Sequence, residues 1–159
     1  MVDTLYDTDF VLWTEQQAAR LRREAESRPN TDIDWTNIAE ELESLGRRDR
    51  RAVQSLLVVL LEHLLKLEHS ADPYPRRQWR VSVTHARNGV RDLLKDSPSL
   101  ASQVEPPLNV AFGRARETCV AVLPPDAEVE LPMTCPYALD DLLDPSWLPP
   151  NRWGINDQP

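Results

Sequence analysis

Apolar residues along this chain recur at intervals of three and four positions, and strict alternation of apolar and polar residues is almost absent. Spacing of this kind places apolar side chains on one face of an α-helix, whereas strands require a period of two. Only four glycines occur. The pattern predicts an all-α protein built as a helical bundle of about four core helices.

The first two core helices are separated by the polar stretch "RPNTDID". We expect the first helix to begin at Asp7 or Thr8, either of which can cap the first turn, and to end before Pro29. The second begins near Asp34, and the residues able to cap it are Thr31, Asp32 and Asp34. Its regularly spaced positions are Trp35, Ile38, Leu42, Leu45, Ala52, Leu56, Val59 and His63, with Asp49 as the polar exception.

This unbroken three-and-four spacing predicts one continuous helix over about 34–70, because a turn would reset its phase. Gly46 is the objection, since glycine often ends a helix. An interior glycine costs only about 1 kcal/mol relative to alanine, however, so a break at Gly46 is the alternative and not the first expectation.

Prolines divide the rest of the chain. "SADPYP" is a connector, and a third helix is expected over about 76–95. Ser97 and Pro98 are a typical helix start and predict a short helix to about Val104. After Pro106 and Pro107, a last core helix is predicted, which "LPP" ends at residues 123–125. Its apolar residues are Leu108, Phe112, Ala115, Cys119 and Val122.

The C-terminal segment differs from the bundle in composition, because eight of the 14 prolines lie from Pro124 onward. We therefore expect a single domain made of a bundle over 1–124 and an extended tail over 125–159 that packs on it. One short helix is expected around 138–143. The apolar residues that would dock the tail are Tyr137, Leu139, Leu142, Leu143, Trp147 and Leu148.

Charge is concentrated in the tail. The net charge is −8, and the segment from Pro125 onward has seven acidic residues against the single base Arg152. Those acids are Asp126, Glu128, Glu130, Asp140, Asp141, Asp144 and Asp157. Phosphate backbones bind basic surfaces, so we do not expect a nucleic-acid partner. An acidic tail can instead mimic such a ligand, and an antitoxin-like neutralising partner is therefore a second alternative function.

The expected location is the cytoplasm. Cys119 and Cys135 are too few and too far apart for a disulfide framework or a metal-binding CxxC motif. The sequence "MVDTLYDTDFVLW" lacks the basic and apolar regions of a signal peptide. The longest apolar run, residues 56–61, is far shorter than the ~20 residues that cross a bilayer, so no membrane association is expected.

The stretch "LLVVLLEHLLKLEH" invites a metal-site interpretation, since helical bundles bind metals through Glu and His. Its Glu-His pairs are adjacent, however, so the two side chains of each pair point about 100° apart. On a helical wheel, Ser55, Glu62, Lys66 and His69 form one solvated polar stripe, and His63 alone lies among the leucines. We expect His63 to have a structural role.

A metal site would need His85 or Glu41 beside His63. His85 lies off the apolar face of its helix, and a continuous second helix separates Glu41 from His63 by about 33 Å. We therefore predict no catalytic residue, metal or cofactor. A metal-binding or metal-dependent hydrolytic bundle centred on His63 is the alternative, and it requires the chain to reverse at Gly46.

Two further groups of residues bear on chemistry. Cys119 lies on an apolar helical face and is expected in the core, while Cys135 lies near acids that oppose thiolate formation. Arg80, Arg87 and Arg91 form a stripe on the third helix. This stripe is either a solvated face or a surface that receives a partner, including the protein's own acidic tail.

The chain resembles the bacterial family known as domain of unknown function 29. The resemblance rests on "LYDTDFVLW", "DIDWTNIAEELESLG", "LLEHLLKLE", "WRVSVTHARNGVRDLLKDSPSL" and "CPYALDDLLDPSWLPP", in this order. It implies an all-α, intracellular bacterial protein and no particular activity. We expect a protein that acts by protein–protein contact, with a homo-oligomer or a regulatory partner, through apolar positions exposed on the tail and the first helix.

Overall fold

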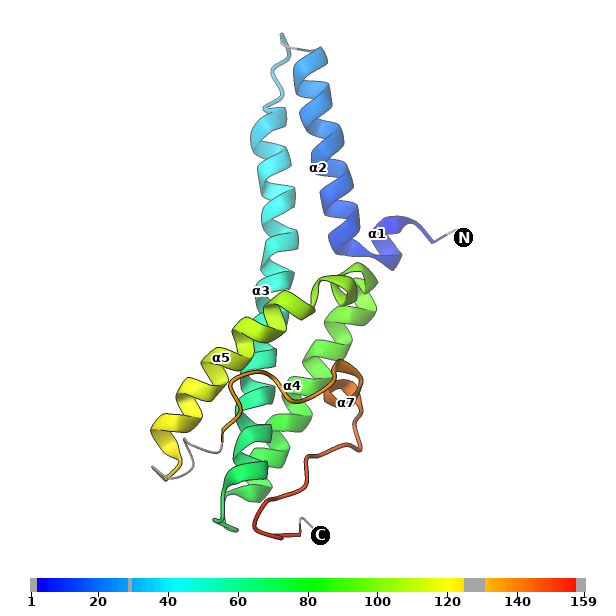
Figure 1. The fold of residues 1–159 in the computed structure, drawn as a ribbon. Coiled ribbons are helices and arrows are strands. Elements are labelled where there is room, and N and C mark those ends of the chain that lie inside the picture. Colours follow the sequence, from blue (N-terminus) through cyan, green and yellow to red (C-terminus); the bar gives the residue numbers. More distant parts are fainter. Residues whose placement is uncertain (1–2, 29, 125–130, 157–159) are drawn as a thin grey trace. The chain divides into compact units, whose positions relative to one another are not determined.

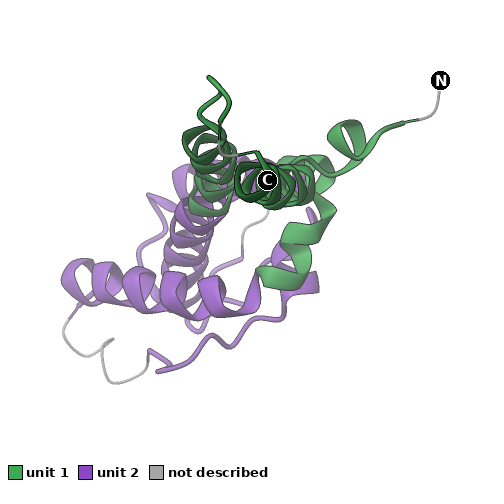
Figure 2. Cartoon of the chain, turned by 90° about the horizontal axis from the view of Figure 1, so that it is seen from above, with its two compact units in different colours: residues 1–52, 92–103 green, residues 53–91, 104–159 purple. Residues whose placement is uncertain are grey.

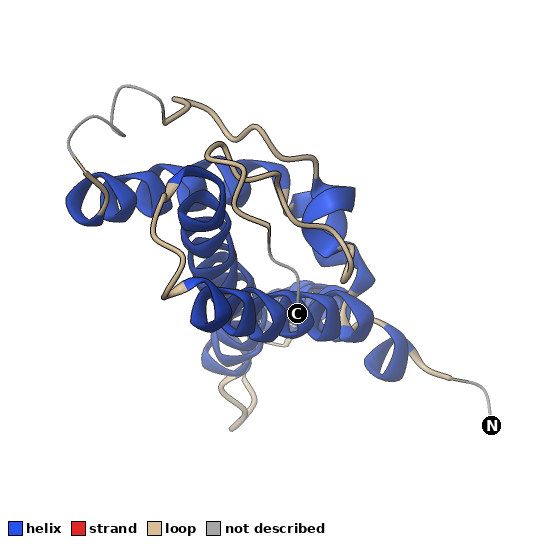
Figure 3. Cartoon of the chain, turned by 90° about the horizontal axis from the view of Figure 1, so that it is seen from below, coloured by secondary structure: helices blue, strands red, loops and turns tan. Residues whose placement is uncertain are grey.

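The computed structural model describes residues 3–28, 30–124 and 131–156, and in these ranges every regular element is a helix (Figure 3). The all-α prediction is therefore confirmed. The elements are α1 (Leu5–Thr8), α2 (Phe10–Ser27), α3 (Trp35–His69), α4 (Arg76–Asp96), the 3-10 helix η1 (Pro98–Gln103), α5 (Glu105–Val122) and α7 (Leu139–Leu143) (Figure 1).

The chain divides into two compact units (Figure 2). Unit 1 comprises residues 1–52 and 92–103, and unit 2 comprises residues 53–91 and 104–159. Both α3 and α4 contribute residues to each unit. The expected separation of a bundle over 1–124 from a tail over 125–159 stays a prediction.

The start of α2 differs from the prediction. Asp7 does not begin the long helix, because its carboxylate accepts hydrogen bonds from the backbone N–H and the hydroxyl of Thr4 and so caps the short α1. These bonds lower the pKa of Asp7. α2 instead begins after Asp9, whose Oδ1 accepts a hydrogen bond from the N–H of Leu12 at 3.0 Å. The helix ends at Ser27, before Pro29, as expected.

The prediction of one continuous helix is confirmed, because α3 runs from Trp35 to His69 through Gly46. Asp34 caps it, with its Oδ1 accepting from the N–H of Asn37 at 3.1 Å. Gly46 has a packing role in unit 1. A Cβ atom there would lie 2.8 Å from Oγ1 of Thr14, so glycine allows α2 and α3 to approach closely.

Unit 2 contains most of the large buried residues. The leucines of α3 at positions 57, 60, 61, 64, 65 and 67 are completely buried. Such burial around most of a helix requires neighbours on several sides, and α4, α5 and the described part of the tail supply them. Burying each leucine side chain contributes about 2 kcal/mol, so this segment is the main apolar core.

Unit 1 is held together mainly by small and polar residues. Its buried apolar residues are Val11, Ala18, Ala39 and Leu100. Asp9 and Ser97 join the start of α2 to η1, because Ser99 donates two hydrogen bonds to Asp9 and the N–H of Val11 donates one to Ser97 Oγ. η1 begins at Pro98 directly after Ser97, as expected, and the hydroxyl of Ser97 contacts α2.

Candidate functional site

His63 does not lie in the leucine core. It is half-buried, and its Nδ1 is 2.8 Å from the carbonyl oxygen of Val59, one turn earlier in α3. The buried histidine is His69, the last residue of α3, which is 5% exposed. The wheel misplaced these two residues because it did not include what packs on the C-terminal half of α3.

The expected solvated stripe of α3 is also wrong, because only Ser55 of its four members is exposed. Lys66 is 8% exposed, and its ammonium group lies 2.5 Å from Oε1 of Glu62. Glu62 and Lys66, which are four residues apart on α3, therefore form an ion pair that is largely withdrawn from water. The last turn of α3 is also covered, since Asn151 donates hydrogen bonds to the carbonyls of Leu67 and Ser70.

The other proposed metal ligands are exposed side chains. Glu41 is exposed on α3 and His85 is exposed on α4, where it lines a shallow surface depression with Arg77 and Arg80. α3 is uninterrupted, so the reversal at Gly46 that the Glu41 hypothesis required does not occur. Among residues 3–28, 30–124 and 131–156, no three His, Cys, Asp or Glu side chains are grouped so that they could hold a metal ion.

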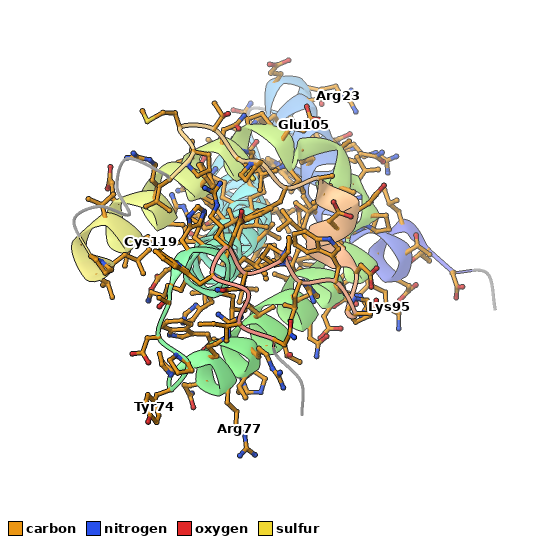
Figure 4. All side chains as sticks on the ribbon, turned by 60° about the horizontal axis from the view of Figure 1, so that its bottom comes forward. Arg23, Tyr74, Arg77, Lys95, Glu105 and Cys119 are labelled. Carbon is orange, nitrogen blue, oxygen red and sulfur yellow. The ribbon has the colours of Figure 1, made fainter. Side chains whose placement is uncertain are left out.

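Both cysteines are in environments that disfavour the thiolate. Cys119, labelled in Figure 4, is completely buried on α5, as predicted, and its Sγ donates to the carbonyl of Glu62 at 3.5 Å. Burial raises its pKa to about 12. Burial also raises the pKa of Cys135, so desolvation opposes ionisation there, in place of the nearby acids suggested by the sequence.

Tyr137 and Glu68 form a buried polar contact between the tail and α3. The hydroxyl of Tyr137 donates to Oε2 of Glu68 at 2.5 Å, and burial raises the pKa of this phenol. The ring of Tyr137 also packs edge-on against Trp147, with centroids 5.5 Å apart. These contacts hold the described part of the tail within unit 2, where Tyr137 is buried and Glu68 and Trp147 are half-buried.

The three arginines of α4 have different roles. Arg87 is 2% exposed and donates hydrogen bonds to the carbonyls of Leu142 and Trp147, at 2.7 and 2.9 Å. Arg91 is exposed and Arg80 is half-buried. Burial lowers the pKa of Arg87 despite the nearby Asp144. The stripe is therefore not simply a solvated face, since one member receives the protein's own tail through backbone carbonyls.

Figure 4 shows Tyr74 and Arg77 extending away from the ribbon near the start of α4. Tyr74 precedes the helix in the connector, and Arg77 lies in its first turn. Both side chains are exposed. They mark the solvated side of this end of unit 2 and form no buried site.

In unit 1, α2 and the N-terminal part of α3 lie side by side as an antiparallel helical hairpin (Figure 1). Arg22 of α2 binds both carboxylate oxygens of Glu43, at 3.2 and 2.8 Å, and Arg50 forms an ion pair with Glu15. Ala18, Ala39 and Gly46 are the buried small residues of this pairing. Because small residues fill the contact between α2 and α3, the large aliphatic side chains of the hairpin are not buried there.

The large aliphatic residues of this hairpin line a shallow groove on α3. Ile38, Leu42 and Leu45 line it together with Asp34, Asn37 and Glu41. Ile38 is 43% exposed, and both leucines are only half-buried. These residues belong to the regularly spaced series noted in the sequence. That series therefore is not the buried face of α3 in unit 1. The buried face is formed by Ala39 and Gly46, each of which directly follows a residue of the series.

Exposed aromatic residues are found at the other end of the hairpin. Tyr6, Phe10 and Trp13 pack against one another with ring centroids 4.9 to 5.9 Å apart. Tyr6 is more than half exposed, while Phe10 and Trp13 are half-buried. The aromatic side of α2 at Phe10 and Trp13 is therefore only partly covered. The buried positions of α2 are Val11, Thr14 and Ala18.

Charged residues around the groove form two classes. Glu40 and Arg47 pair with each other at 2.6 Å, and Glu43 pairs with Arg22. Within the described part of the chain, Glu41, Arg48 and Arg51 take part in no ion pair or side-chain hydrogen bond. Of these three residues, Glu41 lines the groove, and Arg48 and Arg51 follow it along α3.

None of the helices that the structure describes is both long and apolar enough to cross a membrane. α3, the longest, contains charged residues throughout its N-terminal half.

Four of the tail's seven acidic residues lie outside the described residues, namely Asp126, Glu128, Glu130 and Asp157.

Comparisons with known proteins support the same fold. The sequence model of the family described as "Domain of unknown function DUF29" matches residues 5–148. Among solved structures, the chain is similar to an alpha-helical protein of unknown function from Rhodospirillum rubrum, with a TM-score of 0.73 and 26% identity over 92% of this chain and 93% of that one. A search of curated proteins found no match. The likeness supports the helical fold and adds no chemistry.

Proposed function

Because the chain belongs to the DUF29 family, whose description assigns no activity, we propose a function from the molecule's own surface: the protein acts by binding another protein through the α2–α3 hairpin. The role is one of contact and not of catalysis. The observation that carries the proposal is the groove in which Ile38, Leu42 and Leu45 present aliphatic surface to water.

An apolar groove of this kind fits another α-helix. Leu42 and Leu45 follow Ile38 at steps of four and three residues, the spacing with which one helix packs against the next. Leaving such residues in water forfeits about 25 cal/mol for each Å² of apolar area. A partner helix with its own aliphatic stripe would recover that free energy, and the flanking charges would orient it.

The proposal is tested by placing a photo-crosslinking amino acid in the groove of the full chain in living cells. We expect Ile38→p-benzoylphenylalanine to form a discrete crosslinked protein product on irradiation. The same replacement at Val110, which is 49% exposed on α5, is the matched control and is expected to give no such product. Mass spectrometry of the product identifies the partner.

Two outcomes would contradict the proposal. If position 38 forms no crosslink while the variant accumulates and folds as the parent protein does, the groove contacts no protein. If positions 38 and 110 crosslink the same set of proteins equally, the contact is not specific to the hairpin. Circular dichroism of both purified variants verifies the fold.

A further inference from the structure

The partner of the hairpin follows from the order of charges along α3. We propose that the groove is occupied by a second copy of this chain, with the two α3 helices antiparallel, so that Glu41 of each copy lies beside Arg48 of the other. The inference rests on the proposed function and specifies its partner. Its observations are the exposed aliphatic residues, the two charged side chains Glu41 and Arg48, which form no ion pair within the described part of the chain, and the order of these charges along α3.

The apolar surface is of the kind that two helical hairpins bury together. Within unit 1, the largest buried residue that the structure describes on α2 or α3 is Val11, while Ile38, Leu42 and Leu45 stay partly exposed. Four-helix bundles bury such residues between two layers of helices. A second hairpin therefore supplies the missing layer, and the same chain is the partner whose helix has the matching spacing.

The charges specify the direction of the pairing. Glu41 and Arg48 are seven residues apart, which is two turns, so both lie on the groove side of α3. In an antiparallel pair with two-fold symmetry, aligning Glu41 with Arg48 of the second copy also aligns Arg48 with Glu41 of that copy. A parallel pair would instead place each residue beside its own equivalent, and like charges would repel.

The same alignment brings the aliphatic residues together. The two-fold axis passes between Ser44 and Leu45, midway between the paired charges, so the Leu45 residues of the two copies meet at the centre of the contact and Leu42 of each copy lies beside them. Ile38 lies one turn further out on each side. Asp49, the polar exception in the spaced series, lies at the edge of this contact and limits it to one register.

The test is a charge exchange measured by sedimentation equilibrium on the full chain. The parent protein is expected to sediment as a dimer of the 18.2 kDa chain at micromolar concentration. Glu41→Arg and Arg48→Glu should each raise the dimer dissociation constant by at least about tenfold, because each single change creates two like-charge contacts. The double variant Glu41→Arg with Arg48→Glu should restore the parent value to within about threefold, because it recreates both opposite-charge contacts.

Loss of folding cannot imitate this result, because a double variant that restores the dimer must be folded. Neither side chain forms an ion pair or hydrogen bond with any other residue that the structure describes, so both single variants should also keep the parent's circular dichroism. Glu117→Arg on α5, where the glutamate is exposed, is the matched control and should leave the dissociation constant unchanged. Added salt should weaken the effect of the single variants.

The outcomes separate this inference from the proposed function. A parent protein that stays monomeric at about 100 μM overturns the inference, as does a dimer that the single variants do not weaken or the double variant does not restore. If such a chain still crosslinks a different protein at position 38, the proposed function stands with another partner. If it crosslinks nothing, both fail.

Discussion

Asp9 shows how one buried side chain joins two helices of unit 1. Its carboxylate accepts hydrogen bonds from the N–H of Leu12, and from the N–H and the hydroxyl of Ser99, at 2.7 to 3.0 Å. A carboxylate that is only 7% exposed would be costly without such donors. These three bonds make Asp9 both the cap of α2 and the anchor of η1.

We therefore predict that Asp9→Ala lowers the free energy of unfolding by about 2 kcal/mol. The change removes a helix cap and leaves buried donors of η1 without an acceptor. Urea denaturation followed by circular dichroism gives the number. Asp92→Ala, at an exposed position of unit 1, is the control and should change stability by less than about 0.5 kcal/mol. Equal effects of the two substitutions would show that the Asp9 contacts contribute nothing.

At the scale of elements, Gly46 decides how closely α2 and α3 pack. Alanine at this position would improve helix propensity by about 1 kcal/mol, but its Cβ would collide with Oγ1 of Thr14. That hydroxyl is itself buried and donates to the carbonyl of Val11 at 2.7 Å. In Gly46→Ala, the collision thus lowers the free energy of unfolding, while the better helix propensity raises it.

A double-mutant cycle separates these two contributions. Gly46→Ala alone should lower the free energy of unfolding by about 1 kcal/mol, because the helices must move apart. In a Thr14→Ala background the same change should raise it by about 1 kcal/mol, because only the gain in propensity remains. Thermal and urea denaturation of the four proteins measure the coupling. A Gly46→Ala effect with the same sign in both backgrounds would exclude the steric explanation.

Gly113→Ala provides an independent check on the propensity value. Gly113 lies inside α5, where an added Cβ would have no neighbour within 4 Å. With no collision to offset it, alanine should raise the free energy of unfolding by about 1 kcal/mol. The measurement is the same urea denaturation, and a destabilised variant would contradict the prediction.

The elements could be predicted from the sequence better than their buried faces could. Periodicity correctly predicts α3 as one helix, because residues spaced three and four apart stay on one side of a continuous helix, whatever packs around it. The same periodicity does not tell which stripe is covered. Ile38, Leu42 and Leu45 are spaced like core residues, yet Ala39 and Gly46 are the buried ones, because α2 packs where small residues permit a close approach.

At the scale of the whole chain, the buried polar residues could not be predicted, because they depend on contacts between distant segments. Arg87 and Tyr137 are buried by contacts between the tail and the helices, with partners 55 and 69 residues away. No local pattern distinguishes Arg87 from the exposed Arg91 four residues later. Likewise, Lys66 and Glu62 have the spacing of a surface pair, and only the fold of unit 2 withdraws them from water.

Arg87 tests whether the tail contributes to the stability of unit 2. Arg87→Met keeps an apolar side chain of similar length but leaves the carbonyls of Leu142 and Trp147 without their donor. Because bonds from a charged donor are stronger than neutral ones, we expect a loss of about 2 to 4 kcal/mol in the free energy of unfolding. Limited proteolysis should then cut residues 131–156 faster than in the parent protein.

The neighbouring Arg91→Met is the matched control for this prediction, since Arg91 is exposed and donates no hydrogen bond to the described part of the tail. It should leave both unfolding and proteolysis close to the parent values. If Arg87→Met unfolds and is cleaved like Arg91→Met, the tail's contacts with Arg87 do not stabilise the fold. Arg87→Lys should be intermediate, because an ammonium group keeps the charge but cannot reproduce the planar fork that reaches two carbonyls at once.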